Sequence, residues 1–195
     1  GDTLTVSVGR DSRLSGPRIR DAVVRALTAG GARVLDCGMA STPAMFMTTV
    51  DLGCDGAVQI TASHHPSHRN GLKFFVPQGG LEGEDIEAIL ENAQEGRSCT
   101  AGQPGKTEKT DYMTAYAARL RRLIVDGVGA GDQPLKGFHL LVDAGNGAGG
   151  FYATQVLEPL GADISGSQFL EPDGHFPNHI PNPENEEAMA SVCAA

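Results

Sequence analysis

Apolar runs of strand length alternate with amphipathic segments of helical length, and this alternation constrains the fold more than any other feature of the chain. Residues 4–8 alternate along the period of a β-strand, and residues 17–27 follow with an apolar stripe of helical period. Strand-like runs recur at residues 33–37, 56–60 and 72–76. Because short links join these segments, the sequence predicts an α/β sandwich with helices on both faces of the sheet.

Three further segments are expected to be helices, at residues 42–50, 84–94 and 110–125. In the second, the apolar residues expected to face inward are Ile86, Ile89 and Leu90. In the third, the residues expected on the apolar side are Tyr112, Tyr116, Leu120, Leu123 and Ile124. The polar stretch at residues 97–109, rich in Gly, Pro and Thr, predicts a loop.

A glycine-rich stretch at residues 127–137 predicts a link between two domains, because it contains four glycines, an aspartate and a proline. We therefore expect one domain at residues 1–128 and part of a second at 129–195. The elements expected in the second are two short strands, a helix and a last short helix, at residues 138–142, 162–165, after Gly150 and near 184–192.

The polar loop between two of the apolar runs carries a candidate nucleophile. Ile60-Thr61-Ala62-Ser63-His64-His65-Pro66 leaves one predicted strand, and Asn70-Gly71-Leu72-Lys73 enters the next. A serine hydroxyl is a poor nucleophile unless a base or a charge activates it, and His64 and Lys73 are the nearest candidates in sequence. The same residue types also build ordinary polar hairpin loops, so the composition of the loop leaves both interpretations open.

Arg10 and Arg13 lie between the first predicted strand and the first predicted helix. A strand end that leads into a helix N-terminus is a natural anion site, and arginine adds bidentate recognition of phosphate. The alternative is a solvated loop in which Asp11 pairs with an arginine. Of the two arginines, Arg13 is the one for which a structural role is also expected.

The net charge of −9 and the isoelectric point near 5.0 argue against nucleic acid or an anionic membrane surface as the main partner. No apolar run approaches the roughly 20 residues that span a bilayer. The four cysteines show no C-x-x-C spacing, which favours reduced thiols. We expect an intracellular protein, cytoplasmic or plastid, whose targeting segment would not be visible in these residues.

The string around Ser63 resembles the phosphoserine loop of the α-D-phosphohexomutases, the phosphoglucomutase and phosphomannomutase family. The family's usual form is T-A-S-H-N-P followed by N-G-x-K, and His65 stands here in place of its asparagine. The resemblance continues through most of the chain in the expected order. The other matching segments are residues 8–16, 38–43, 142–147 and 176–179.

This resemblance implies a three-layer α/β/α sandwich with a mixed sheet, followed by the start of a second α/β domain. It also implies a phosphoglucomutase- or phosphomannomutase-type isomerase that shifts phosphate between the 1- and 6-positions of a hexose, with Ser63 as the phosphoryl carrier. His64 and Lys73 would be acid/base groups or, for Lys73, a cation that stabilises the transferring phosphate. Arg10 would be a further catalytic residue, and Arg10, Arg13 and Asn70 would bind substrate or phosphate.

The cofactors implied are Mg²⁺, held in this chain only through the phosphate on Ser63, and a primer of the glucose 1,6-bisphosphate type. The aspartate loop that supplies the family's other metal ligands has no counterpart in the sequence, and neither do the family's third and fourth domains or its opening strand. We therefore expect a fragment that is inactive alone, with a small phosphosugar and the missing C-terminal domains as its partners.

Three alternatives stay open at this stage. The chain could be a non-catalytic or interaction fragment that keeps the fold. Gly145-Asn146-Gly147-Ala148-Gly149-Gly150 follows a predicted strand and satisfies G-x-G-x-x-G, with Asp163 as the acid of a dinucleotide site. His64, His65 and His68 could suggest zinc, although one short loop lacks a second ligand group and the usual spacing.

Overall fold

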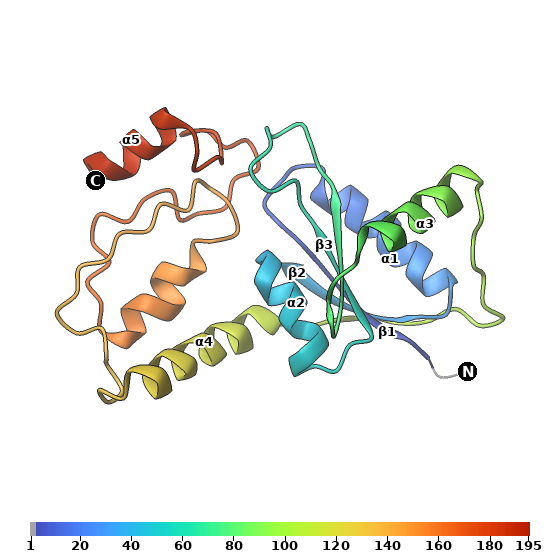
Figure 1. Ribbon diagram of the computed structural model, residues 1–195, viewed down its shortest axis with the longest axis horizontal. Coiled ribbons are helices and arrows are strands. Elements are labelled where there is room, and N and C mark those ends of the chain that lie inside the picture. The colour runs from blue at the N-terminus through green and yellow to red at the C-terminus, as the bar shows by residue number, and fades with distance from the viewer. Residues whose placement is uncertain (1–2) are drawn as a thin grey trace. The chain divides into compact units, whose positions relative to one another are not determined.

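The computed structural model describes residues 3–195, which form two compact units (Figure 1). We call the first the sheet unit; it comprises residues 3–10, 15–61 and 71–110. The C-terminal unit comprises residues 111–195 together with two loops of the earlier sequence, residues 11–14 and 62–70. Within residues 3–195, no helix combines the length and the apolar character needed to cross a membrane.

A mixed six-stranded sheet forms the centre of the sheet unit, in the order β5-β4-β3-β1-β2-β6. The strands β1, β2, β3 and β6 are parallel, whereas β4 and β5 are antiparallel to their neighbours. Their bounds are Thr5–Arg10 (β1), Arg33–Met39 (β2), Gly56–Ile60 (β3), Leu72–Val76 (β4), Gly79–Gly80 (β5) and Thr107–Lys109 (β6). The four strands expected from the apolar runs are confirmed.

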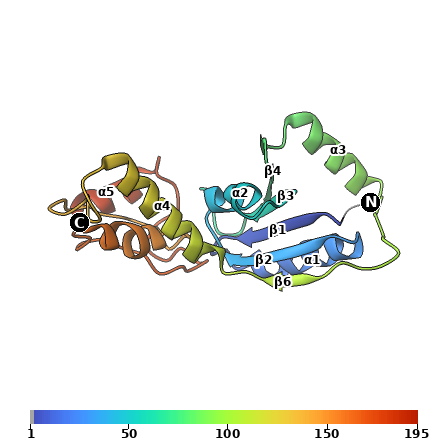
Figure 2. The ribbon, with the colours of Figure 1, turned by 90° about the horizontal axis from the view of Figure 1, so that it is seen from below.

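Two helices cover opposite faces of this sheet: α1 (Gly16–Ala29) lies on one face and α2 (Thr42–Asp51) on the other (Figure 2). The side chain of Ser41 accepts a hydrogen bond from the backbone N–H of Ala44 and so caps α2. On the α1 side, Ile19, Val23 and Leu27 pack on the buried strand residues Val8, Val34, Val58 and Ile60. The three-layer arrangement expected for this part of the chain is therefore confirmed.

Gly9 in β1 leaves room for the side chains of Met45 in α2 and Gln59 in β3, which pack against it. A Cβ atom at this position would lie within 2.8 Å of Met45 Cγ and 2.9 Å of Gln59 Oε1, closer than such atoms pack.

The order of the strands reverses at β1. Because β1 lies between β2 and β3, and α1 and α2 cross on opposite faces, the chain adds β2 on one side of β1 and β3 on the other. Ligands of open α/β sheets bind at the carboxyl ends of strands next to such a reversal.

Two expectations for the sheet unit are wrong. Part of the expected loop at residues 97–109 is β6, whose three residues pair in parallel with Val34 to Asp36 of β2 and form the edge of the sheet. Such a short strand has too few residues to show a period in the sequence. The helix α3 (Gly83–Gln94) is present, but Ile89 and Leu90 are exposed and none of its residues is buried. Its apolar residues have the spacing of a core face, but no core residue of the sheet unit packs over them.

The C-terminal unit is built on α4 (Tyr112–Val128), the π-helical turn η1 (Tyr152–Leu157), the 3₁₀ turn η2 (Glu158–Leu160) and α5 (Glu186–Ala194). Its core joins Ala117 of α4 to Val156 and Leu160. Leu123, expected on the apolar side of α4, is exposed. The helix ends at Gly129, whose φ of 67° is left-handed, as helix C-termini favour.

The strands expected at residues 138–142 and 162–165 are only isolated β-bridges, which pair His139 with Asp163 and Asp143 with Gln168. Backbone bonds make both bridges, since Asp163 bonds to Phe138 and Leu140, and Gln168 bonds to Val142 and Ala144. Side chains bond the backbone between the bridges. Ser167 Oγ accepts a hydrogen bond from the N–H of Val142, and the Asp163 carboxylate accepts one from the N–H of Ser165. Short polar side chains that bond nearby backbone groups compete with sheet formation in this way.

Candidate active site

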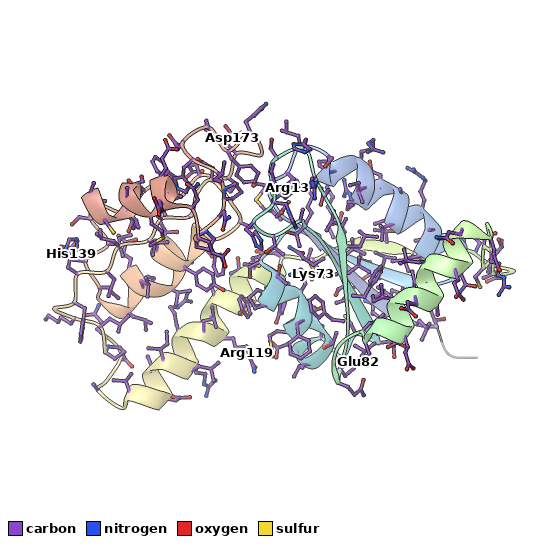
Figure 3. All side chains as sticks on the ribbon, turned by 45° about the horizontal axis from the view of Figure 1, so that its top comes forward. Arg13, Lys73, Glu82, Arg119, His139 and Asp173 are labelled. Atoms are coloured by element: carbon purple, nitrogen blue, oxygen red, sulfur yellow. The ribbon has the colours of Figure 1, made fainter. Side chains whose placement is uncertain are left out.

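Two of the predicted site residues lie at one end of the sheet unit. Arg10 is the last residue of β1 and pairs in register with Ile60, the last residue of β3. Lys73 lies in β4 opposite Gln59 of β3 (Figure 3). The carboxyl ends of β1 and β3 thus meet where β4 begins. Just beyond them the N–H of Thr61 donates to the carbonyl of Gly71 at 3.0 Å. The loop that carries Ser63 leaves and re-enters the sheet at this bond.

Ser63 is exposed and adopts a left-handed backbone conformation, with φ of 54°. Non-glycine residues adopt this conformation at a cost, and such residues cluster at functional sites. Ser63 Oγ lies 3.4 Å from Nδ1 of His64, whose ring stacks on that of His65 with centroids 5.1 Å apart. The predicted nucleophile and one predicted base are therefore side by side at the tip of the loop.

Arg13 is fully buried and donates hydrogen bonds to four backbone carbonyls of this loop, those of Ser63, His65, Pro66 and Arg69. Its Nε donates to the carboxylate of Asp11 at 3.1 Å. All five N–H groups of the guanidinium are therefore bound within the protein. Of the two roles expected for Arg13, phosphate binding and structure, these contacts favour the second. Asn70 ends the loop and is half-buried, and its role stays a prediction.

The structure adds Phe176, which the residue-by-residue reasoning did not assign to the site. Its ring centroid lies 5.2 Å from the guanidinium carbon of Arg13. The only signal in the sequence was the resemblance of residues 176–179 to the family's second domain, and this resemblance did not indicate a contact between Phe176 and Arg13. The separation of the two residues in sequence leaves no local pattern that could predict the contact.

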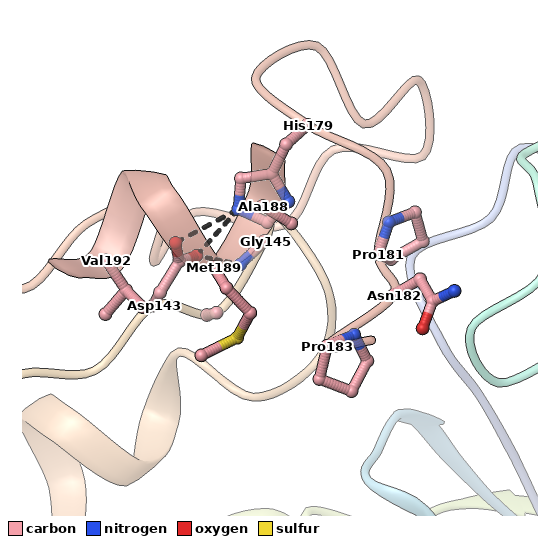
Figure 4. Close-up of a pocket in the computed structure, with 10 residues that line it drawn as sticks. Asp143, Gly145, His179, Pro181, Asn182, Pro183, Ala188, Met189 and Val192 are labelled. Carbon is pink, nitrogen blue, oxygen red and sulfur yellow. Dashed lines mark hydrogen bonds and ion pairs between the residues drawn. The ribbon is translucent and has the colours of Figure 1, made fainter. Parts of the chain in front are cut away.

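His179 and Asp143 form a hydrogen-bonded pair in the C-terminal unit. Nε2 of His179 lies 3.0 Å from Oδ2 of Asp143 (Figure 4). Nδ1 of His179 lies 2.8 Å from the carbonyl oxygen of Ile180. Partial burial lowers the pKa of His179, but the hydrogen bonds to Ile180 and Asp143 outweigh it, so the pKa of His179 is raised above its ordinary value. The pair lines a surface pocket of about 380 Å³ together with Asn182, Met189 and Val192.

Two alternatives lose their structural basis. The glycine-rich turn at residues 145–150 leads from an isolated bridge into a π-helical turn, whereas a dinucleotide site needs a strand before the turn and an α-helix after it. Across residues 3–195, no group of three or more His, Cys, Asp or Glu side chains is placed to hold a metal ion. The histidines of the Ser63 loop therefore form no zinc site with other such residues of this part of the chain.

Comparison with known proteins agrees with this geometry along nearly the whole chain. Residues 1–98 match the family model described as phosphoglucomutase/phosphomannomutase, alpha/beta/alpha domain I. Residues 114–195 match the model for alpha/beta/alpha domain II of the same enzymes. The boundary expected between residues 128 and 129 stays a prediction.

Individual relatives carry the same names. A phosphomannomutase/phosphoglucomutase of Pseudomonas putida is 36% identical over 97% of this chain and 38% of its own length. A phosphoglucomutase/phosphomannomutase of Thermococcus kodakarensis is also 36% identical, over 97% of this chain and 42% of its own. A crystal structure of a family protein from Burkholderia thailandensis superposes with a TM-score of 0.81 at 32% identity, over 98% of this chain and 41% of that one. The chain thus spans about two fifths of the length of these relatives.

Proposed function

Because the chain belongs to the phosphoglucomutase/phosphomannomutase family, we propose that this protein is a phosphohexomutase that interconverts hexose 1-phosphate and hexose 6-phosphate. The observation that carries the proposal is the state of Ser63. It is exposed, left-handed and held at the tip of a loop that leaves the carboxyl end of β3. A phosphoryl carrier must meet its substrate in a fixed position, and a strained residue on a supported loop meets that requirement.

In the proposed reaction Ser63 carries the phosphoryl group at rest. A hydroxyl of the sugar phosphate attacks this phosphorus, the Oγ–P bond breaks, and the proton lost by the hydroxyl is balanced by one gained by Ser63 Oγ. The product is a bisphosphorylated sugar, which turns and returns its other phosphoryl group to Ser63. Catalysis of phosphoryl transfer consists mainly of positioning and of neutralising charge on the transferring group.

The other predicted residues have distinct parts in this scheme. Nδ1 of His64, at 3.4 Å from Ser63 Oγ, is the candidate that exchanges a proton with the serine. Lys73 and Arg10 are candidates to neutralise phosphate charge, and Lys73 is also a candidate acid or base. Asn70 is a candidate substrate contact. Arg13 is left to position the loop, as its contacts indicate.

Mg²⁺ and a bisphosphate primer are the proposed cofactors. Residues 3–195 place no cluster of acidic or histidine side chains that could hold the ion, so this part of the chain would contribute only an oxygen of the phosphate on Ser63. Bound Mg²⁺ would withdraw charge from the transferring phosphoryl group. For the same reason we propose that the 195 residues alone do not turn over substrate.

Substitution of Ser63 tests the function. Native protein should carry phosphate on Ser63, which peptide mapping by mass spectrometry can find, and Ser63→Ala in the full-length enzyme should abolish glucose 1-phosphate conversion. Ser67→Ala, in the same exposed loop, is the matched control and should keep its activity. A Ser63→Ala enzyme with a normal rate would rule out the assignment, and a wild-type enzyme without phosphate or turnover would favour a non-catalytic protein that keeps the fold.

Turnover by the 195-residue chain itself tests the second part of the proposal. We expect none above background when the chain is given glucose 1-phosphate, Mg²⁺ and a bisphosphate primer. A rate within the ordinary enzyme range of about 1–10³ s⁻¹ would contradict it.

A further inference from the structure

We propose that Arg13 is the positioning residue of the Ser63 loop: its buried guanidinium holds the loop backbone so that Ser63 keeps its left-handed conformation, and Phe176 holds the guanidinium in place. The inference rests on the proposed function only in taking Ser63 as the phosphoryl carrier. No local pattern in the sequence assigns this role, because the bonded residues lie 50 to 56 positions apart.

The contacts around Arg13 account for the shape of the loop. Nη2 donates to the carbonyls of Ser63 and His65 at 2.8 and 2.6 Å, and Nη1 donates to those of Pro66 and Arg69 at 2.7 and 3.0 Å. Four carbonyls that converge on one planar cation fix their peptide planes together, because the guanidinium donors have a rigid fork geometry. Hydrogen bonds to a charged group are also stronger than neutral ones.

This convergence also orients the N–H groups of the loop. The residues described include no cis peptide bond, and in a trans peptide the N–H points away from the carbonyl of the preceding residue. When the carbonyls of Ser63, Pro66 and Arg69 point at Arg13, the N–H groups of His64, Ser67 and Asn70 therefore point away from it.

Arg13 is itself held from two sides. Asp11 accepts from both the backbone N–H and Nε of Arg13, at 3.0 and 3.1 Å. The ring of Phe176 lies over the guanidinium at 5.2 Å, within the range of a cation–π contact. Phe176 has φ of 51°, so its backbone is strained in the same sense as that of Ser63. The turn that carries it is therefore kept in a costly conformation that places the ring on Arg13.

Gly174 explains how this turn comes so close to Arg13. A Cβ atom at Gly174 would lie 2.7 Å from the N atom of Leu14 and 3.0 Å from the carbonyl carbon of Arg13, and nearer still to the carbonyl oxygen of Ser12. These are backbone atoms, which cannot move aside as a flexible side chain can. The fit of residues 174–176 against residues 12–14 thus connects the later part of the C-terminal unit to the Ser63 loop through Arg13.

Hydrogen exchange of the loop amides tests the role of Arg13 without requiring catalysis. The amides to follow are those of His65 and Arg69, which donate to the carbonyls of Ala62 and Pro66 at 3.0 Å each and so report on the loop. The variants are Arg13→Lys, Arg13→Ala and Phe176→Leu. The control is Arg122→Lys, since Arg122 is an exposed arginine of α4 in the same unit. Lysine keeps the charge but has three donors on one compact group, so it cannot hold four carbonyls and Asp11 together.

We expect both Arg13 variants to raise exchange at the two amides by about tenfold or more, Phe176→Leu by about threefold, and Arg122→Lys by less than about twofold. Millimolar guanidinium added to Arg13→Ala should restore protection, while it leaves the wild type unchanged. Exchange in Arg13→Ala within about twofold of the wild type would overturn the proposal, and so would failure of guanidinium to restore protection. If Arg13→Ala loses protection in α4 as well, Phe176→Leu decides, and unchanged loop exchange in that variant would overturn the proposal.

A second measurement separates this inference from the proposed function. In the full-length enzyme, Arg13→Lys should lower kcat by about tenfold or more while KM changes by less than about threefold, because the phosphoryl carrier is misplaced and the substrate contacts remain. A raised KM with normal kcat would overturn the positioning role. A wild-type enzyme that takes no phosphoryl group from glucose 1,6-bisphosphate would refute the proposed function alone, since the exchange result would still decide the role of Arg13.

Discussion

Replacing Ser63 with glycine should stabilise the protein while it removes the phosphoryl acceptor. Ser63 has φ of 54°, in the region that only glycine adopts without steric cost. A side chain in this conformation costs about 1–2 kcal/mol per residue. Glycine removes that cost, but it adds backbone freedom to the unfolded chain that costs about 0.5–1 kcal/mol. Loss of the contact between the hydroxyl and His64 should cost little, since Ser63 is exposed and the contact is long, at 3.4 Å.

The difference between the two terms predicts a gain of roughly 0.5–1 kcal/mol in the free energy of unfolding. For a chain of this length, 1 kcal/mol corresponds to about 2–4 °C in the midpoint of thermal unfolding, so the midpoint should rise by about 1–4 °C. Ser63→Ala keeps a Cβ atom and should show no such gain. The phosphoryl carrier would thus be a site where function opposes stability.

Ser67 offers a matched control in the same loop. It is exposed, and its φ is not positive, so Ser67→Gly should suffer only the entropic cost of glycine and lose about 0.5–1 kcal/mol. The stabilities of the two variants should therefore differ by about 1–2 kcal/mol in favour of Ser63→Gly, which is the cost of the left-handed conformation alone. Urea unfolding followed by circular dichroism, with unchanged slopes between variants, measures this difference.

Equal stabilities of Ser63→Gly and Ser67→Gly would refute the reasoning. Such a result would mean that Ser63 does not adopt the left-handed conformation in solution, or that its hydroxyl makes a contact worth as much as the strain. Ser63→Thr separates these explanations, because a β-branched residue with a hydroxyl should be the least stable variant if the left-handed conformation is retained.

Three further outcomes are expected. His65→Asn in the full-length enzyme should change kcat by less than about tenfold, or roughly 1.4 kcal/mol, because His65 bonds to Arg13 and Ala62 through its backbone. A collapse of kcat would show that its ring has a role of its own. Because the pKa of His179 is raised, the wild type should be more stable than His179→Gln below about pH 6.5 and should lose this advantage as the pH rises through the raised pKa. Thermal unfolding of both proteins from acid to alkaline pH measures the difference. An advantage that grows with pH would contradict the prediction. Burial raises the pKa of Cys37 to about 12, so a thiol reagent at pH 8 should label exposed Cys99 rapidly and Cys37 only after denaturation, as peptide mapping can show.

Local periodicity was sufficient to predict most regular elements of the sheet unit. The alternation in residues 4–8 and the helical stripe in residues 17–27 correspond to β1 and α1, because the period of apolar residues and the backbone conformation are properties of the same few residues. It failed where the element was too short to show a period, as in β6, or where a side chain interrupted a ladder, as at Val142 and Ser167.

The order of the motifs was also sufficient to indicate the family and the candidate nucleophile. A chain with T-A-S-H followed by N-G-L-K between two apolar runs places a serine on a loop whatever the rest of the molecule does. The order of the motifs could not predict the backbone conformation of Ser63. Its left-handed φ is seen only in the folded backbone.

Arg13 shows where the tertiary structure decided the outcome. From the sequence, the residue could equally bind phosphate or support the fold, because an arginine near a strand end suits both roles. The structure buries Arg13 completely and directs its donors to four carbonyls that lie 50 to 56 positions away in sequence. The ring of Phe176 lies over the guanidinium. Which carbonyls converge on one cation depends on how distant segments pack, and the spacing of residues along the chain carries no record of that packing.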